Sequence, residues 1–341
     1  MKLGSYHWKG YLIALALLLV PLVAAACSDE EKPTIKLADT QFESLWINNA
    51  VAKFVIESAY GYPVETVEMT TVIFQATLAA GEIDLMLEGW EQNMPDWYSE
   101  EIDNGNIENL GPIYEGGPQF FVIPTWVHDQ HGINTVADMK DKWELFKDPE
   151  DGSKGLFINC IIGWQCAEIN TVKLEAYGLD ASYNIMSPGS AAALDAGLAG
   201  AQKKSEPVFG YYWAPTALIG AYDWYILEEP EYNDACWADI TAAREDKSLR
   251  PIGAACAYET LPTNSLAWSG LKDKAPEVHE LINNMNMGVD ALNKTAAWSQ
   301  DNNVQDYQDA AVYFLENFED KWTSWMSSGD TKKVKDALSE L

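Results

Sequence analysis

Positive charge is scarce in this chain of 341 residues. It has 22 lysine and arginine residues against 52 aspartate and glutamate residues, which gives a formal net charge of -30. Such an acidic chain repels the phosphates of nucleic acids and the anionic headgroups of lipids. We therefore expect no nucleic-acid partner and no attachment to a membrane through basic patches. The acidic surface also favours solubility.

Cysteine and histidine are also few, with five and four residues. The spacing Cys160-x5-Cys166 is not a usual zinc-ligand spacing, and His128-x-x-His131 lies in a polar, loop-like stretch. We therefore expect neither a metal site nor a cofactor. The Gly-x-Ser-x-Gly elbow, the Walker phosphate loop and the His-Glu-x-x-His motif are absent as well. Nothing singles out a catalytic centre, so we expect a protein that is not an enzyme.

The sequence also lacks an apolar run of the roughly 20 residues that a transmembrane helix needs. Its longest such run, Leu12 to Val23, follows Lys2 and Lys9 and precedes Ala24-Ala25-Ala26-Cys27. This order predicts a lipoprotein signal peptide over residues 1–26, lipidation at Cys27 and a polar tether over residues 27–33. The alternative is an ordinary secretory signal. Either way we expect an extracytoplasmic protein, held at the membrane only by its lipid if Cys27 is modified.

Four cysteines remain after Cys27, and an exported protein can join them in two disulfides. Four cysteines allow three pairings, and the sequence alone does not decide among them. We favour the pairing of nearest neighbours in sequence, Cys160 with Cys166 and Cys236 with Cys256.

The rest of the chain alternates strand-like and helix-like runs, which is typical of α/β layers. The predicted strands cover residues 34–38, 63–69, 83–87, 156–159, 183–186, 207–212, 224–227, 252–258 and 265–268. The predicted helices cover residues 42–58, 70–80, 166–177, 190–204, 275–287 and 306–326. A crossing near mid-chain and a late return predict two α/β lobes around a hinge. Residues 34–123 and 258–341 would form lobe I, and residues 124–257 lobe II, with a ligand cleft between them.

Tryptophan is abundant, and three of the 14 residues directly follow strand-like runs, in short polar or glycine-flanked segments. These are Trp90, Trp164 and Trp213. Ligands of open α/β sheets bind at the carboxyl ends of strands. Indole faces attract cations and form the cages that recognise quaternary ammonium groups. The positions therefore predict an aromatic cage, in which Trp46 would be a fourth wall unless it packs its helix.

The other end of the ligand has a candidate site as well. The helix that opens at Cys166, directly after Gln165, presents free backbone N–H groups and a favourable dipole to an anion. Carboxylates at Glu88, Glu91 and Glu168 would accept hydrogen bonds from a hydroxylated or protonated ligand. The competing expectation is that Glu88 and Glu91 are solvated and that Glu168 occupies the first turn of its helix.

Three blocks of sequence carry a resemblance to a known family. They are Cys160-Ile-Ile-Gly-Trp164-Gln-Cys166-Ala-Glu168, Pro207-Val-Phe-Gly-Tyr-Tyr-Trp213-Ala-Pro215 and the run from Ile83-Asp-Leu to Trp90 followed by Asn93-Met94. Together they resemble the glycine betaine/proline betaine-binding proteins of osmoprotectant ABC importers. The resemblance implies a bilobal type II periplasmic-binding-protein fold, a disulfide around the Trp164 loop, and delivery of the ligand to ABC permease subunits. It implies a monomer that performs no covalent chemistry.

The first tryptophan loop departs from the family pattern. The family places a histidine there to hold the ligand carboxylate, whereas this chain reads Gln92-Asn93-Met94-Pro95. Asn93 is the expected substitute, with Gln92 as the alternative. The predicted ligand is a glycine betaine-like solute, and the alternatives are trimethylamine N-oxide, choline or another methylated amine or sulfonium compound. A binding protein for sugars or peptides, whose aromatic residues stack on rings, is a further alternative.

Overall fold

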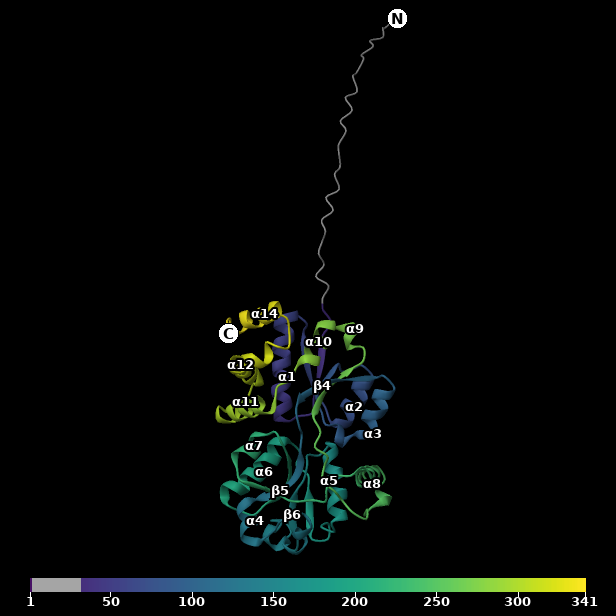
Figure 1. The fold of residues 1–341 in the computed structure, drawn as a ribbon, viewed down its shortest axis with the longest axis vertical. Coiled ribbons are helices and arrows are strands. Elements are labelled where there is room, and N and C mark those ends of the chain that lie inside the picture. The colour runs from purple at the N-terminus through teal and green to yellow at the C-terminus, as the bar shows by residue number, and fades with distance from the viewer. Residues whose placement is uncertain (2–31) are drawn as a thin grey trace. The chain divides into compact units, whose positions relative to one another are not determined.

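Two mixed five-stranded sheets organise the part of the chain that the structure describes, Met1 and residues 32–341 (Figure 1). The structure is a computed structural model. The predicted signal peptide and Cys27 lie outside the described residues. No helix within the described residues is both long and apolar enough to cross a bilayer.

The first sheet has the strand order β2-β1-β3-β10-β4. Strand β1 is parallel to β2 and β3, and β10 is antiparallel to β3 and β4. The strands are β1 (Ile35–Asp39), β2 (Val64–Glu68), β3 (Leu85–Gly89), β4 (Ile107–Tyr114) and β10 (Thr263–Trp268). The associated helices are α1 (Glu43–Val55), extended by a π-helical turn (Ile56–Tyr60), α2 (Thr71–Ala79), α3 (Pro95–Asp103), α9 (Leu271–Lys274), α10 (Pro276–Asn284), α11 (Val289–Asp301), α12 (Tyr307–Asn317), α13 (Glu319–Trp322) and α14 (Ser328–Leu338).

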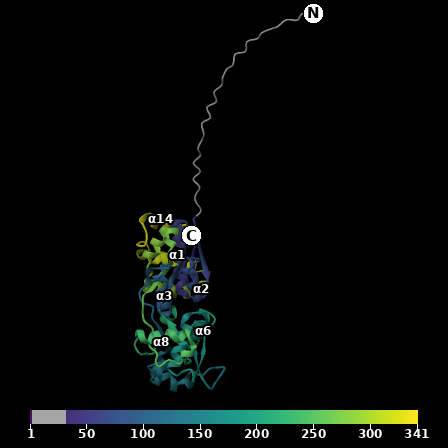
Figure 2. The same ribbon diagram turned by 90° about the vertical axis from the view of Figure 1, so that its right-hand side faces the viewer.

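The second sheet has the order β7-β6-β8-β5-β9. Strand β6 is parallel to β7 and β8, and β5 is antiparallel to β8 and β9. The strands are β5 (Gln119–Pro124), β6 (Gly155–Ile158), β7 (Tyr183–Met186), β8 (Phe209–Trp213) and β9 (Trp224–Ile226). The helices are α4 (Thr125–His131), α5 (Gln165–Ala176), α6 (Ala191–Lys204), α7 (Ala217–Ala221) and α8 (Asp234–Glu245). Figures 1 and 2 both show α6 and α8 in the part of the molecule that holds this sheet. Helices α1, α2 and α14 lie in the other part.

Strands β3, β5 and β8 are buried along their whole length, because each lies inside its sheet with strands on both sides. Their near-continuous apolar sequences suit such positions. At the end of β3, Gly89 allows β10 to pack closely. A Cβ atom there would lie 2.6 Å from Leu266 Cδ1 and 3.1 Å from the Asn264 carbonyl oxygen. Glycine at this point therefore brings the two strands together immediately before Trp90.

Some predicted elements need correction. Residues 252–258 form no strand. They run as irregular backbone that is tied to α8 by the disulfide between Cys236 and Cys256. The predicted helix over residues 306–326 breaks at Phe318 into α12 and α13, because Phe318 leaves the helical region at φ -128° and ψ 44°. The spacing of aromatic residues in this segment predicted which face is buried. It did not predict that the helix ends at Phe318.

The chain crosses from the first sheet to the second between β4 and β5, because β5 pairs with β8 and β9. Residue 123, where lobe I was expected to end, lies in β5. The return is made by the irregular segment that ends at β10.

Candidate functional site

A cavity of about 60 Å³ is lined by residues associated with both sheets. A site needs roughly 10–15 Å³ to hold one water molecule, so this space accepts a small organic group. The first sheet and its connections contribute Thr40, Phe42, Thr71, Phe74, Met86, Glu88, Trp90, Asn93 and Met94. The second contributes Gln119, Trp164, Gln165, Cys166, Tyr211 and Trp213.

Three of the predicted tryptophans meet at this cavity. Trp164 and Trp213 form an edge-to-face pair with ring centroids 5.4 Å apart at an interplanar angle of 74°. Phe42 presents an edge-to-face contact to each of them, at 5.4 and 6.3 Å. The Trp90 ring packs so closely on Gly117 that a Cβ atom there would lie 2.7 Å from it. The cavity therefore has aromatic walls from both sheets.

Each of these tryptophans sits at the carboxyl end of a strand, as the sequence predicts. Trp90 follows β3, Trp213 is the last residue of β8, and Trp164 follows the loop after β6. Gly163 adopts φ +93°, a left-handed conformation that glycine tolerates, and turns the chain directly before Trp164.

The amino end of α5 borders the cavity through Gln165 and Cys166. Trp164 is its N-cap residue and supplies no side-chain cap, and the N–H groups of a first helical turn have no acceptor within the helix. The structure joins Cys160 to Cys166 and Cys236 to Cys256, the pairing that the sequence favoured. The first bridge and the hydrogen bond from Cys160 N to Asn159 Oδ1, at 2.7 Å, hold this loop.

Asn93 lines the cavity, but its amide is already paired. It donates to Gln119 Oε1 at 3.2 Å and accepts from Gln119 Nε2 at 2.9 Å. Tyr211 donates to the same Gln119 oxygen at 2.7 Å. Asn93 thus links the loop after Trp90 to β5.

Trp46 does not line the cavity. Its indole N–H points at Asp39, with Nε1 3.0 and 3.2 Å from the two carboxylate oxygens, and its ring packs on Tyr307 at 5.2 Å. The expected fourth wall is therefore not Trp46, which packs α1 against α12. Phe42, Phe74 and Tyr211 are the other aromatic residues that line the cavity. Tyr211 precedes Trp213 by two residues, so strand periodicity placed both on one face.

Glu88 is not solvated, which was the competing expectation for this residue. Its side chain is buried, with an exposed fraction of 0%. Asn48 Nδ2 donates to Oε1 at 2.7 Å, and Ser44 Oγ and Tyr114 OH donate to Oε2 at 3.2 and 2.7 Å. Burial raises the pKa of Glu88 to about 7, against the opposing effect of these donors. A carboxyl group that changes charge near neutral pH therefore lines an aromatic cavity.

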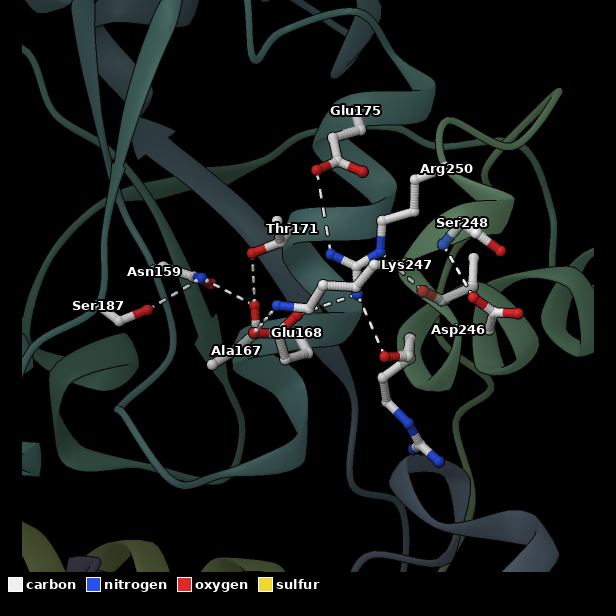
Figure 3. Close-up of polar contacts among 12 residues, drawn as sticks. Asn159, Ala167, Glu168, Thr171, Glu175, Ser187, Asp246, Lys247, Ser248 and Arg250 are labelled. Atoms are coloured by element: carbon white, nitrogen blue, oxygen red, sulfur yellow. Dashed lines mark hydrogen bonds and ion pairs between the residues drawn. The ribbon is translucent and has the colours of Figure 1, made fainter.

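The other two carboxylates have different surroundings. Glu91 is partly buried, accepts hydrogen bonds from Asn109 and Asn264, and has its pKa raised by burial. Glu168 lies in the first turn of α5 and pairs with Arg250 at 3.0 Å and Lys247 at 3.7 Å (Figure 3). Neither residue lines the cavity.

Helix α8 reaches the loop after Trp90 through two side chains that sequence reasoning missed. Trp237 Nε1 donates to the Gln92 carbonyl oxygen at 3.1 Å, and Arg244 Nη1 donates to the Asn93 carbonyl oxygen at 2.7 Å. Both acceptors are backbone carbonyl oxygens far away in the sequence. Every residue has such an oxygen, so no sequence pattern indicates these contacts. We call Trp237 and Arg244 the α8 latch.

Two mixed α/β sheets with an aromatic cavity between their connections define the type II periplasmic-binding-protein class. Residues 33–317 match the family described as the substrate binding domain of the ABC-type glycine betaine transport system, and the chain belongs to that family.

Individual relatives are distant. The chain is 23% identical to the glycine betaine/proline betaine-binding periplasmic protein of Salmonella typhimurium over 181 residues, 52% of this chain and 53% of that protein. It therefore spans about half the length of this relative. It is 22% identical to the trimethylamine N-oxide-binding protein of Pelagibacter ubique over 65% of this chain and 72% of that one. The crystal structure of the glycine/betaine/L-proline-binding protein (ProX) of Borrelia burgdorferi shares the fold, with a TM-score of 0.69 and 20% identity over 88% of this chain and 99% of that one.

Proposed function

We propose that this chain captures a small quaternary-ammonium solute, such as glycine betaine, and delivers it to an ABC permease. The observation that carries the proposal is the convergence of Trp90, Trp164 and Trp213 on one cavity. A quaternary ammonium group has a delocalised charge and an apolar surface, and it has no hydrogen to donate. Aromatic faces satisfy it through cation–π attraction and apolar contact.

The expected affinity follows from the number of rings. Each aromatic face contributes about 0.5–2 kcal/mol, more when water is excluded. Three or four faces, after the costs of ordering, support binding on the order of -8 kcal/mol, which corresponds to micromolar dissociation constants. The free N–H groups at Gln165 and Cys166 provide a place for a ligand carboxylate.

The proposed mechanism is closure of two lobes, with residues 258–341 joining the amino-terminal lobe. We place the first crossing just before Gln119, where strand pairing changes sheets. Contacts that span the sheets support a closed arrangement, among them the Asn93–Gln119 amide pair. We propose that the protein works as a lipid-anchored monomer outside the cytoplasm. If Cys27→Ala incorporates as much labelled palmitate as the wild type, this anchor is wrong.

Isothermal titration calorimetry with glycine betaine, choline and trimethylamine N-oxide tests the proposed function. Maltose and a dipeptide serve as controls for the sugar and peptide alternatives. We expect at least one methylated amine to bind at micromolar concentration and the controls to give no binding heat. Absence of binding by all three methylated amines at millimolar concentration would overturn the proposal.

A further inference from the structure

We infer that Glu88 is a specificity-determining residue: its carboxylate supplies the counter-charge for the ligand's cationic group and favours solutes with a net positive charge. This inference rests on the proposed function, because it concerns the same cavity. The aromatic rings select ligands with a methylated ammonium group, and Glu88 would further select among these ligands by their net charge.

Glu88 is part of the cavity wall. It stands on β3 two residues after Met86 and two residues before Trp90, and all three residues line the cavity. Alternate residues of a strand point to one face, so β3 presents the Met86 thioether and the Glu88 carboxyl group on the same face, and Trp90 follows directly after the strand ends at Gly89. The carboxylate is thus built into the same wall as one of the cage tryptophans.

Glu88 has no compensating positive charge among the described residues around it. The three groups that donate to Glu88, from Ser44, Asn48 and Tyr114, are all neutral. Among the described residues that line the cavity there is no lysine, arginine or histidine. A buried carboxylate is costly unless it is paired with a cation. A bound quaternary ammonium group supplies that missing charge.

A purely structural role of Glu88 would have different consequences for ligand binding. Glu88 also connects α1 to β4, because Asn48 and Tyr114 donate to it. Three neutral donors stabilise the ionised form of a carboxylate by hydrogen bonding, and a buried glutamine would satisfy part of the same network. A structural link alone has no reason to prefer a cation in the cavity. The preference for charge is therefore the property to measure.

The experiment compares choline with 3,3-dimethylbutan-1-ol, its neutral carbon isostere, and with glycine betaine, a zwitterion. Dissociation constants are measured for the wild type, for Glu88→Gln and for Glu168→Gln as a matched carboxylate outside the cavity. We expect the preference for choline over the isostere to fall at least tenfold in Glu88→Gln. The ratio of choline to glycine betaine affinity should fall as well, and Glu168→Gln should keep the wild-type ratios.

Two outcomes overturn different claims. If the wild type binds none of the quaternary solutes, the proposed function fails. If they bind and Glu88→Gln preserves both ratios, only the role of Glu88 fails. Retained binding of the neutral isostere by the variant shows that the cage is intact.

A measurement on the wild type covers the case in which Glu88→Gln does not fold. Choline affinity should rise severalfold from pH 6 to pH 8 as Glu88 ionises, whereas affinity for the isostere should not rise. Tyr114 is the other titratable side chain in contact with Glu88, and its pKa lies well above this range. Glu43 and Asp195 titrate in the same range but line a separate cavity, so the same pH comparison on Glu43→Gln separates their attraction for choline from that of Glu88. Equal pH profiles for the two solutes would overturn the inference.

Discussion

The indole Nε1 of Trp164 donates a hydrogen bond to the backbone carbonyl oxygen of Thr40 at 2.8 Å. Trp164 caps α5 beside the second sheet, and Thr40 follows β1 of the first sheet. A side chain that forms a wall of the cavity therefore also connects the two halves around it. The ring lines the cavity and the N–H group joins the two halves, so their contributions can be tested separately.

Substitutions at the cage tryptophans should separate these roles. We expect Trp164→Ala and Trp213→Ala each to weaken binding of a quaternary ammonium solute at least tenfold, because each removes an aromatic face. Trp164→Phe keeps a ring and loses the hydrogen bond to Thr40, so its effect should be smaller. Calorimetry gives the affinities and circular dichroism the fold. Trp298→Phe, which alters a ring stacked on Tyr313, is the control. Unchanged affinity in both alanine variants is incompatible with the cage.

The α8 latch should affect how long the ligand stays bound. Arg244→Met removes the hydrogen bond to the Asn93 carbonyl oxygen while keeping an apolar side chain. We expect a roughly tenfold or greater acceleration of dissociation, because a net hydrogen bond from a charged donor is worth about 1.5–3 kcal/mol and every 1.4 kcal/mol is a factor of about ten. Stopped-flow tryptophan fluorescence measures this rate. Lys247→Met, at an exposed position just beyond α8, should leave it unchanged. Equal rates in the two variants would argue against the latch.

Stability without ligand should decrease as pH rises toward neutrality. Burial raises the pKa of Glu88 from an ordinary value of 4.5 to about 7, and the pKa values of Glu43 and Asp195 are raised to about 7 and about 6. Between about pH 4.5 and 7 the unfolded chain has lost these protons while the folded chain retains them. The free energy of unfolding therefore falls through this window, by roughly 3 kcal/mol at most for Glu88.

Denaturant titrations at pH 5.5 and pH 8 measure this difference. Glu88→Gln removes one of the three titrating groups, so the difference between the two pH values should shrink in that variant. A wild type that is more stable at pH 8 than at pH 5.5 would show that other groups dominate the titration.

The sequence predicted the cage tryptophans because their signal is local. A strand-like run that ends in an indole places that indole at a sheet edge, and this holds for Trp90 and Trp213. Whether Trp46 joins the cage could not be predicted from local sequence. It lies near the beginning of α1, and the docking of that helix against α12 places its ring on Tyr307, away from the cavity.

Glu88 shows a second limit of sequence reasoning. A glutamate between leucine and glycine gives no sign of burial, because its donors come from Ser44, Asn48 and Tyr114 on other elements. The irregular segment before β10 was missed for a similar reason. Its apolar residues are buried by contacts with α8 and α5, which a strand-like pattern does not distinguish from sheet pairing.

The position of β10 has a consequence for biosynthesis. This strand lies between β3 and β4, yet all strands of the second sheet precede it in the chain. A chain that emerges from its amino end, at the ribosome or across a membrane, presents every strand of the second sheet before Thr263–Trp268 can fill the gap between β3 and β4. A polypeptide truncated before Thr263 therefore lacks the strand that joins β3 to β4.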